Sequence, residues 1–235
     1  MQPFRSPVFL SRLAIAGLAL AGVCRILYFF AGIAMVFGPS KSFDLGEDQL
    51  SIWELVLGLI ALIFIPIFLF TVVTFLMWLY RIFANLPAVQ SDQTEFTPGW
   101  AVGWWFIPLA NLIKPYQAVR TAWAESDPEV DLEQGFLTSV QPAAPGFMTI
   151  WWAFWIIGNI TSNISNRIDP FSNPGIQSVA GAVAIFESLI WLVGSILAIK
   201  VVSNITERQE QRFARVGNQT LNAPPPPPKF DDVQH

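Results

Sequence analysis

The sequence predicts an all-α integral membrane protein, a four-helix bundle with a short interfacial or re-entrant helix between the second and third spans. Hydrophobic residues make up 53% of its 235 residues and charged residues 13%, whereas soluble globular proteins carry about 25% charged residues. Four mostly apolar stretches approach or exceed the roughly 20 residues that a membrane-crossing helix needs. A further apolar stretch, rich in tryptophan and proline, is too short to cross and predicts the additional helix.

The first span is expected at residues 13–37. Arg5 and Arg12 precede it and resemble the positively charged first region of a signal peptide. However, the apolar run is longer than that of a signal peptide and no A-x-A cleavage site precedes a polar start, so we expect a retained helix. The second span is expected at 52–79.

The third and fourth spans are expected at 147–164 and 179–202. Together the spans define a membrane domain over residues 13–205. An N-terminal segment, 1–12, precedes this domain and a tail, 206–235, follows it.

Lysine and arginine set the expected orientation, because cytoplasmic loops are enriched in them. Only Lys41 and Arg167 lie in the loops on one side, while Arg25 lies inside the first span. The other basic residues all lie on the opposite side, so we expect both termini and the connection 81–146 in the cytoplasm. These residues are Arg5, Arg12, Arg81, Lys114, Arg120, Lys200, Arg208, Arg212, Arg215 and Lys229.

The connection 81–146 contains the stretch FTPGWAVGWWFIPLANLIKPY, residues 96–116. As one helix, its apolar part from 100 to 113 would be about 21 Å long, too short to cross a bilayer. Three interpretations stay open: an aromatic packing element that caps the bundle, a helix in the cytoplasmic interface, or a re-entrant element that turns near Pro108 and Asn111. Trp100 and Trp104 are four residues apart and are expected to stack on one helical face.

This stretch, together with the preceding YRIFANL and the later ITERQ, resembles the bacterial membrane family of domain of unknown function 4328. The resemblance covers roughly Trp53 to Gln211 and implies a multi-span protein of a bacterial cytoplasmic membrane, with no assigned activity. We expect the matching positions to form one cytoplasmic cluster, in which Arg81 and Asn85 hydrogen-bond to the segment from Pro98 to Lys114. The matching positions are Arg81, Asn85, Pro98, Gly99, Trp100, Trp104, Trp105, Pro108, Asn111, Lys114, Pro115, Tyr116 and Trp123.

Arg25 and Glu187 are charged residues near the middle of the first and fourth spans, where charges are costly unless they are paired or hydrated. Each lies 13 residues from a basic flank, Arg12 or Lys200, and so about 20 Å from the cytoplasmic side. We therefore predict that the two side chains meet, with Asn159 of the third span close by. A buried pair that fixes helix register is favoured over a proton relay or a polar substrate contact.

The tail is expected to begin as a helix, NITERQEQRFARV, and to break at Gly217. Its ERQEQR part is interpreted as a solvated helix end. Residues 224–228 are a polyproline run, more typical of a stiff spacer than of a ligand for aromatic grooves.

An enzyme needs positioned acid–base or nucleophilic groups, and no aspartate lies inside a span. The single cysteine, Cys24, lies far along the chain from the one histidine, His235. The net charge of −4 does not indicate a basic surface that would bind nucleic acid. We therefore expect a protein that is not an enzyme and that binds no metal, cofactor or nucleic acid, with the lipid bilayer as its main partner.

The expected function is a non-catalytic assembly, scaffold or accessory role in the membrane, with a second copy or other membrane proteins as possible partners. The alternative is a small oligomeric transporter or channel that uses Arg25 and Glu187. Pro66 and Pro108, which tend to break helices, favour that alternative.

Overall fold

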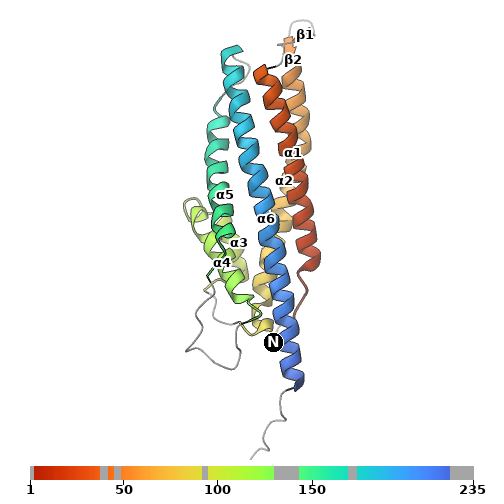
Figure 1. The fold of residues 1–235 in the computed structure, drawn as a ribbon, viewed down its shortest axis with the longest axis vertical. Helices are drawn as coiled ribbons and strands as arrows, with labels where there is room; N and C mark the ends of the chain where they lie inside the picture. Colours follow the sequence, from red (N-terminus) through yellow and green to blue (C-terminus); the bar gives the residue numbers. More distant parts are fainter. Residues whose placement is uncertain are drawn as a thin grey trace, which may run out of the picture.

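The fold consists of long helices that run side by side along one axis (Figure 1). The computed structural model describes residues 3–37, 42–44, 49–91, 95–129, 143–168 and 174–222. The all-α prediction is confirmed for the bulk of the chain. The four long helices are α1 (Val8–Phe37), α2 (Ile52–Asn85), α5 (Gly146–Ser165) and α6 (Pro174–Asn222).

Three stretches, Val8–Phe37, Leu55–Val89 and Ile176–Asn218, are long and apolar enough to cross a membrane, judged by length and composition. Their outward faces carry exposed aliphatic and aromatic side chains, such as Leu62 and Phe68, which are 69% and 50% exposed. The chain thus has the apolar helices of a membrane protein. α5 coincides with the predicted span 147–164 but does not meet the same hydropathy criterion, because tryptophan, asparagine, serine and threonine make up much of its sequence.

The link between α1 and α2 contains a short ribbon that the all-α prediction missed. Strands β1 (Ser42–Asp44) and β2 (Gln49–Ser51) pair antiparallel, with Phe43 opposite Leu50. Three-residue strands are too short to leave an alternating pattern in the sequence.

Close helix packing depends on glycine where α1 crosses α6. A Cβ added to Gly32 would lie 2.9 Å from the carbonyl oxygen of Gly181, and a Cβ on Gly181 would meet Gly32 in the same way. Small residues at such a crossing let two backbones approach closely, as they do in membrane helix pairs. α1 also packs along α2, whereas α5 packs on α6. α2 continues as one helix through Pro66.

α6 is longer than a membrane span. Its 49 residues extend over about 73 Å at 1.5 Å per residue, more than twice the roughly 30 Å of a hydrocarbon core. The predicted break at Gly217 is wrong, because the helix continues to Asn222. A glycine inside a helix costs only about 1 kcal/mol, and the rest of the helix outweighs it. The polyproline run at 224–228 lies outside the described residues.

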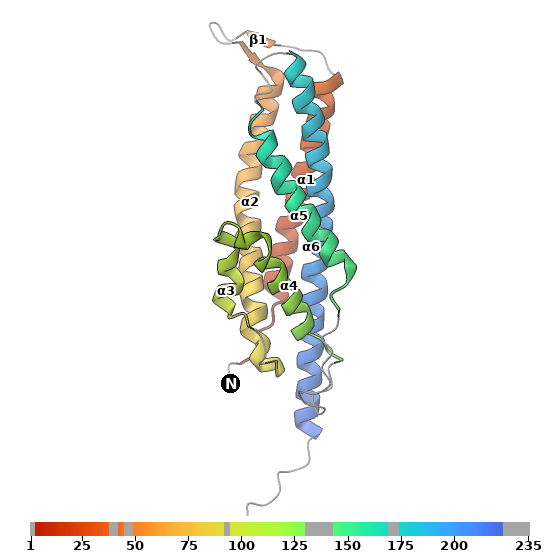
Figure 2. The same ribbon diagram turned by 90° about the vertical axis from the view of Figure 1, so that its left-hand side faces the viewer.

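The tryptophan- and proline-rich segment is a broken hairpin and not a single helix over 100–113, and it reverses close to Pro108, as the re-entrant interpretation expected. It contains α3 (Pro98–Gly103), two 3₁₀ turns and α4 (Lys114–Glu125), and it rises beside α2 and returns (Figure 2). Pro108 lacks an N–H and favours an extended residue before it, and Ile107 is extended at φ −96°, ψ 114°. Leu109 follows at φ 65° and reverses the chain. The two 3₁₀ turns are η2 (Trp104–Phe106) and η3 (Ala110–Leu112).

The densest core lies at the end of the bundle where α2 finishes and α4 packs. Trp78, Leu79, Ile82 and Val119 are fully buried there, and Ile205 of α6 joins them. This end also contains a 3₁₀ turn, η1 (Leu86–Val89), directly after α2. We call this end the head: residues 4–6, 78–91, 118–127 and 202–216.

Candidate functional site

The structure brings Arg25 of α1 and Glu187 of α6 together, as the depth argument predicts. Arg25 Nη1 lies 3.4 Å from Glu187 Oε1. The side chains are 16% and 13% exposed, so neither is sealed off. The pair lies between helices that are otherwise apolar, where an unpaired charge would be costly.

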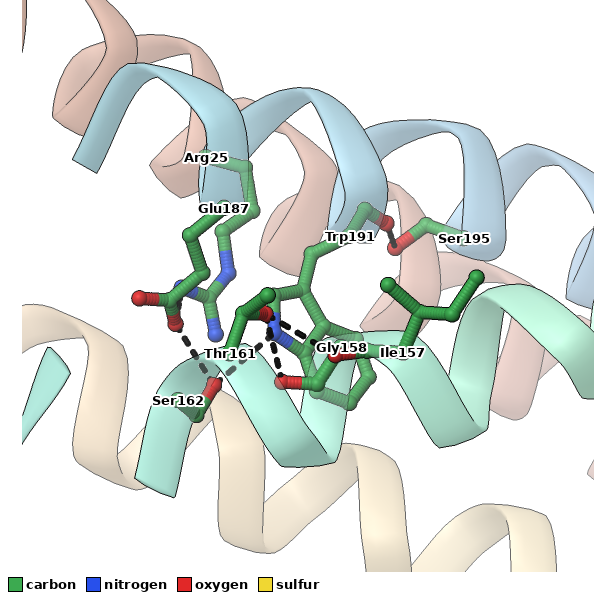
Figure 3. Close-up of polar contacts among 8 residues, drawn as sticks. All are labelled: Arg25, Ile157, Gly158, Thr161, Ser162, Glu187, Trp191 and Ser195. Atoms are coloured by element: carbon green, nitrogen blue, oxygen red, sulfur yellow. Dashed lines mark hydrogen bonds and ion pairs between the residues drawn. The ribbon is translucent and has the colours of Figure 1, made fainter. Parts of the chain in front are cut away.

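Two further residues complete the polar cluster around the pair (Figure 3). Ser162 Oγ of α5 donates a 2.6 Å hydrogen bond to Glu187 Oε1. Trp191 Nε1 of α6 donates to Ser162 Oγ over 3.1 Å. The Arg25 guanidinium lies 4.7 Å from the ring centre of Phe64 on α2. Side chains from all four long helices therefore surround one ion pair, and its hydrogen-bonded chain joins α1, α6 and α5.

Asn159 lines the same groove as the pair, so it lies nearby as predicted, but among the described residues it makes no hydrogen bond to either charged side chain. Its side-chain amide donates instead to Trp155 O, one turn back in α5, over 2.8 Å. Ser162, three residues further along the same helical face, makes the hydrogen bond to the pair. Depth alone could not distinguish them, and a serine in an apolar helix often bonds only to its own backbone.

An open groove of about 800 Å³ extends along the bundle from this cluster. It lies between α2 and α5, because α2 packs on α1 while α5 packs on α6. Toward the outer end, α5 lines the groove with polar side chains while α1 and α2 line it with apolar ones such as Met35 and Leu57; toward the head the lining is mainly aromatic. The polar lining includes Asn159, Ser162, Ser165, Asn166 and Glu187, and the aromatic lining includes Phe68, Phe75, Trp105, Trp151 and Trp155.

The head end of the groove contains two polar atoms without partners among the described residues. Trp105 Nε1 and Asn111 Oδ1 are buried and make no hydrogen bond, although both side chains line the groove. Leaving such a group unpaired costs about 1–3 kcal/mol. No group of three or more metal-ligating side chains was found within the described ranges.

The tryptophan- and proline-rich segment packs its rings against α2 and α5. Trp105 lies 5.3 Å from Phe75 and 5.9 Å from Trp155, measured between ring centres. Tyr116 stacks on Trp152, whose Nε1 donates to Leu112 O over 3.1 Å. The segment therefore closes the groove toward the head.

The entry to this segment has its own aromatic cluster. Trp100 and Trp104 contact each other as predicted, with ring centres 4.8 Å apart, although their ring planes are inclined by 33° and not parallel. Lys114 Nζ lies 5.8 Å from the Trp104 ring centre. Pro98 and Pro115 lie in the first turns of α3 and α4. N–H groups there have no acceptor within the helix, so a proline costs no helical hydrogen bond. Gly99 faces open space, since an added Cβ would meet nothing within 4 Å.

Asn85 does not bond to that segment, and this prediction is wrong. Its side-chain amide donates to Arg5 O over 2.9 Å and to Gln209 Oε1 over 3.0 Å, and Gln209 donates in turn to Ile82 O. No hydrogen bond joins Arg81 to the segment within the described part of the chain. Asn85 therefore ties α2 to the N-terminal segment and to α6.

The ERQEQR stretch is not a solvated helix end. Gln209 is fully buried and Arg212 is 5% exposed. Arg212 donates to Val89 O over 2.8 Å and to Asp127 O over 3.0 Å. Arg208 pairs with Asp127 at 3.0 Å and lies 4.1 Å from the ring centre of Trp123. These residues lock α6 to η1 and to the end of α4.

The same elements account for the family match. A family model described as Domain of unknown function (DUF4328) matches residues 42–207. This chain belongs to that family. The DUF4328 match includes α2, the broken hairpin, α5 and most of α6, and it confirms the resemblance recognised in the sequence. No curated protein and no solved structure matches the chain significantly.

Proposed function

We propose that this DUF4328 protein crosses a bacterial cytoplasmic membrane four times, with α5 as a full span and both termini in the cytoplasm. The 20 residues of α5 give about 30 Å of helix, the thickness of a hydrocarbon core. The basic residues support the orientation, because cytoplasmic segments are enriched in them. Arg208 and Arg212 lie at the head, on the side proposed to be cytoplasmic, and Arg167 follows the end of α5 that points away from the head.

We further propose that the broken hairpin is re-entrant. Trp105 contacts Phe75, which is six residues before Arg81 and hence about 9 Å deeper along α2. The tip of the hairpin is apolar and open, with Phe106 67% and Leu109 82% exposed. Such a tip suits contact with acyl chains, while the neighbouring Trp105 ring packs on Phe75 of α2 and Trp155 of α5.

The function that the geometry supports best is a non-catalytic assembly or accessory role, in which the head is a fixed platform for another membrane protein. The observation that carries this proposal is the continuity of α6. One helix runs from the apolar spans into the head and is fixed there through buried Gln209 and Arg212. A partner bound to the head is then held at a set height and angle to the bilayer.

Site-specific photocrosslinking in native membranes tests the platform. A photoreactive phenylalanine analogue is placed at the exposed head positions Glu207, Gln211 and Ala214. The matched control position is Ile196, which is 58% exposed on the apolar part of the same helix. We expect a discrete protein adduct from at least one head position and not from Ile196. If the head positions give no discrete adduct, the platform role is wrong.

The groove favours the second candidate, a small oligomeric transporter that uses Arg25 and Glu187. Along α6 the groove ends at Ala198, where the rings of Trp105 and Trp151 line it. One chain therefore provides no continuous path across the membrane, and transport would need a second copy of the chain. Reconstituted vesicles distinguish the two candidates. Solute or proton flux that disappears in an Arg25→Gln variant supports transport, and absence of flux leaves the accessory role.

A further inference from the structure

The groove has the polarity of an amphiphile. On the α5 side its outer part is lined by amide and hydroxyl side chains, among them Asn159 and Ser165, opposite apolar residues of α1 and α2. Its inner part is lined by rings, such as those of Phe68 and Phe75. A ligand with a polar head and an apolar tail matches this gradient in one direction only, with the head toward the outer end of α5. The volume of about 800 Å³ lies within the roughly 300–1,000 Å³ of small-molecule sites.

The opening of the groove lies between α2 and α5, a side that the proposed membrane topology places against the bilayer. α5 ends at Ser165, one turn after Ser162, and stops below the outer ends of the other long helices (Figure 2). A lipid-like molecule can enter sideways between α2 and α5 without passing through the head.

The ion pair at the junction of the two halves has hydrogen-bonding capacity left over. A guanidinium has five N–H donors, and the described residues supply one acceptor to Arg25, at 3.4 Å. Both Arg25 and Ser162 bond to the same oxygen of Glu187, Oε1, which leaves Oε2 for another donor. Both side chains are partly exposed and line the groove, so the pair is accessible from it.

We propose that this groove binds a zwitterionic amphiphile. Its anionic group accepts hydrogen bonds from the free N–H groups of Arg25, its ammonium group donates to Glu187 Oε2, and its chains lie along the aromatic half. A purely anionic head would also face the negative charge of Glu187, and an uncharged head would satisfy neither charge. A head with one charge of each sign matches the pair.

The test compares short-chain diacyl lipids that share the same two hexanoyl chains and differ only in the head. The heads are phosphoethanolamine, which is zwitterionic; phosphoglycerol, which is anionic; and an uncharged glycerol. Purified full-length protein in mild detergent is titrated below the micelle-forming concentration of each lipid, and affinity is read from the shift in the thermal unfolding midpoint. We expect phosphoethanolamine lipid to bind about tenfold more tightly than the other two, the size of one charge-assisted hydrogen bond.

Two double variants assign the preference to the pair. Arg25→Gln with Glu187→Gln removes both charges and keeps polar side chains, and we expect the three lipids then to bind equally. The matched control, Arg208→Gln with Asp127→Asn, neutralises the ion pair in the head. It leaves the groove unchanged, so the wild-type preference should persist.

Several results would overturn the proposal. These are equal affinity for the three lipids in the wild type, a preference for phosphoglycerol, no binding of any lipid, or an unchanged preference without the two charges. If the neutral variant does not fold, Arg25→Glu with Glu187→Arg replaces it, because this exchange keeps one charge of each sign. It must retain the zwitterion preference, and its loss would also contradict the proposal.

Discussion

Replacing Gln209 with leucine tests whether the head is held by its buried polar side chains. The amide donates to Ile82 O over 2.9 Å and accepts from Asn85 Nδ2 over 3.0 Å. Each lost bond reduces stability by about 0.5–1.5 kcal/mol, and the Asn85 N–H left without a partner adds about 1–3 kcal/mol. Leucine fills a similar volume, so we expect a loss of about 2–4 kcal/mol in the free energy of opening the head.

The assay is amide hydrogen exchange of α2 and α6 in mild detergent, because exchange of protected amides reports local opening. At about 1.4 kcal/mol per factor of ten, exchange near residues 82–91 should accelerate roughly 30-fold or more. The matched control is Gln211→Leu, two residues along, where the side chain is exposed and bonds only to Glu207 at 3.1 Å. A control of this kind should change stability by less than about 0.5 kcal/mol. Equal, small effects of the two variants would refute the idea that buried amides hold the head together.

Three further predictions concern the spans. Gly158→Ala should lower the midpoint of thermal unfolding, because the added Cβ would lie 2.8 Å from the ring of Trp191. Overpacking of this kind costs about 1–3 kcal/mol. The control Gly194→Ala should be nearly neutral, because the nearest atom to its added Cβ is 3.8 Å away. Glu187→Gln alone should be less stable than the double variant that also carries Arg25→Gln, since one partner without the other leaves an unpaired charge; a single variant as stable as the wild type would show that the pair is dispensable. A cysteine introduced at Arg167 should react with an impermeant maleimide added outside intact cells, and the native Cys24 should not interfere because it is buried; labelling only after permeabilisation would reverse the orientation.

The sequence predicted the ion pair because helix rise converts a residue count into depth. Arg25 and Glu187 each lie 13 residues from a basic flank, and antiparallel helices place equal depths side by side. The same count placed Asn159 near the pair, but depth does not fix the rotation of α5 about its own axis. The packing of Trp191 against Gly158 sets that rotation, and it brings Ser162 to Glu187.

The head could not be predicted in the same way. Gln209 and Arg212 belong to a run of polar residues that resembles the solvated surface of a helix. Their partners are backbone carbonyls of Ile82 and Val89, more than 120 residues earlier, and nothing in a sequence marks a carbonyl as available. A turn near Pro108 was one of three interpretations of the hairpin segment, and the sequence could not select it for a related reason. Its reversal depends on the positive φ of Leu109, a residue type that rarely adopts it.

The uninterrupted length of α6 has a mechanical consequence. Glu187 and Gln209 are 22 residues apart, about 33 Å along a single axis and close to six whole turns, so they point to nearly the same side. A helix resists twisting between two such points, and a small rotation at one level therefore turns the other by a similar angle. Whatever repositions the carboxylate of Glu187 in the groove therefore also reorients the amide of Gln209 in the head, because no break in the helix separates the two residues.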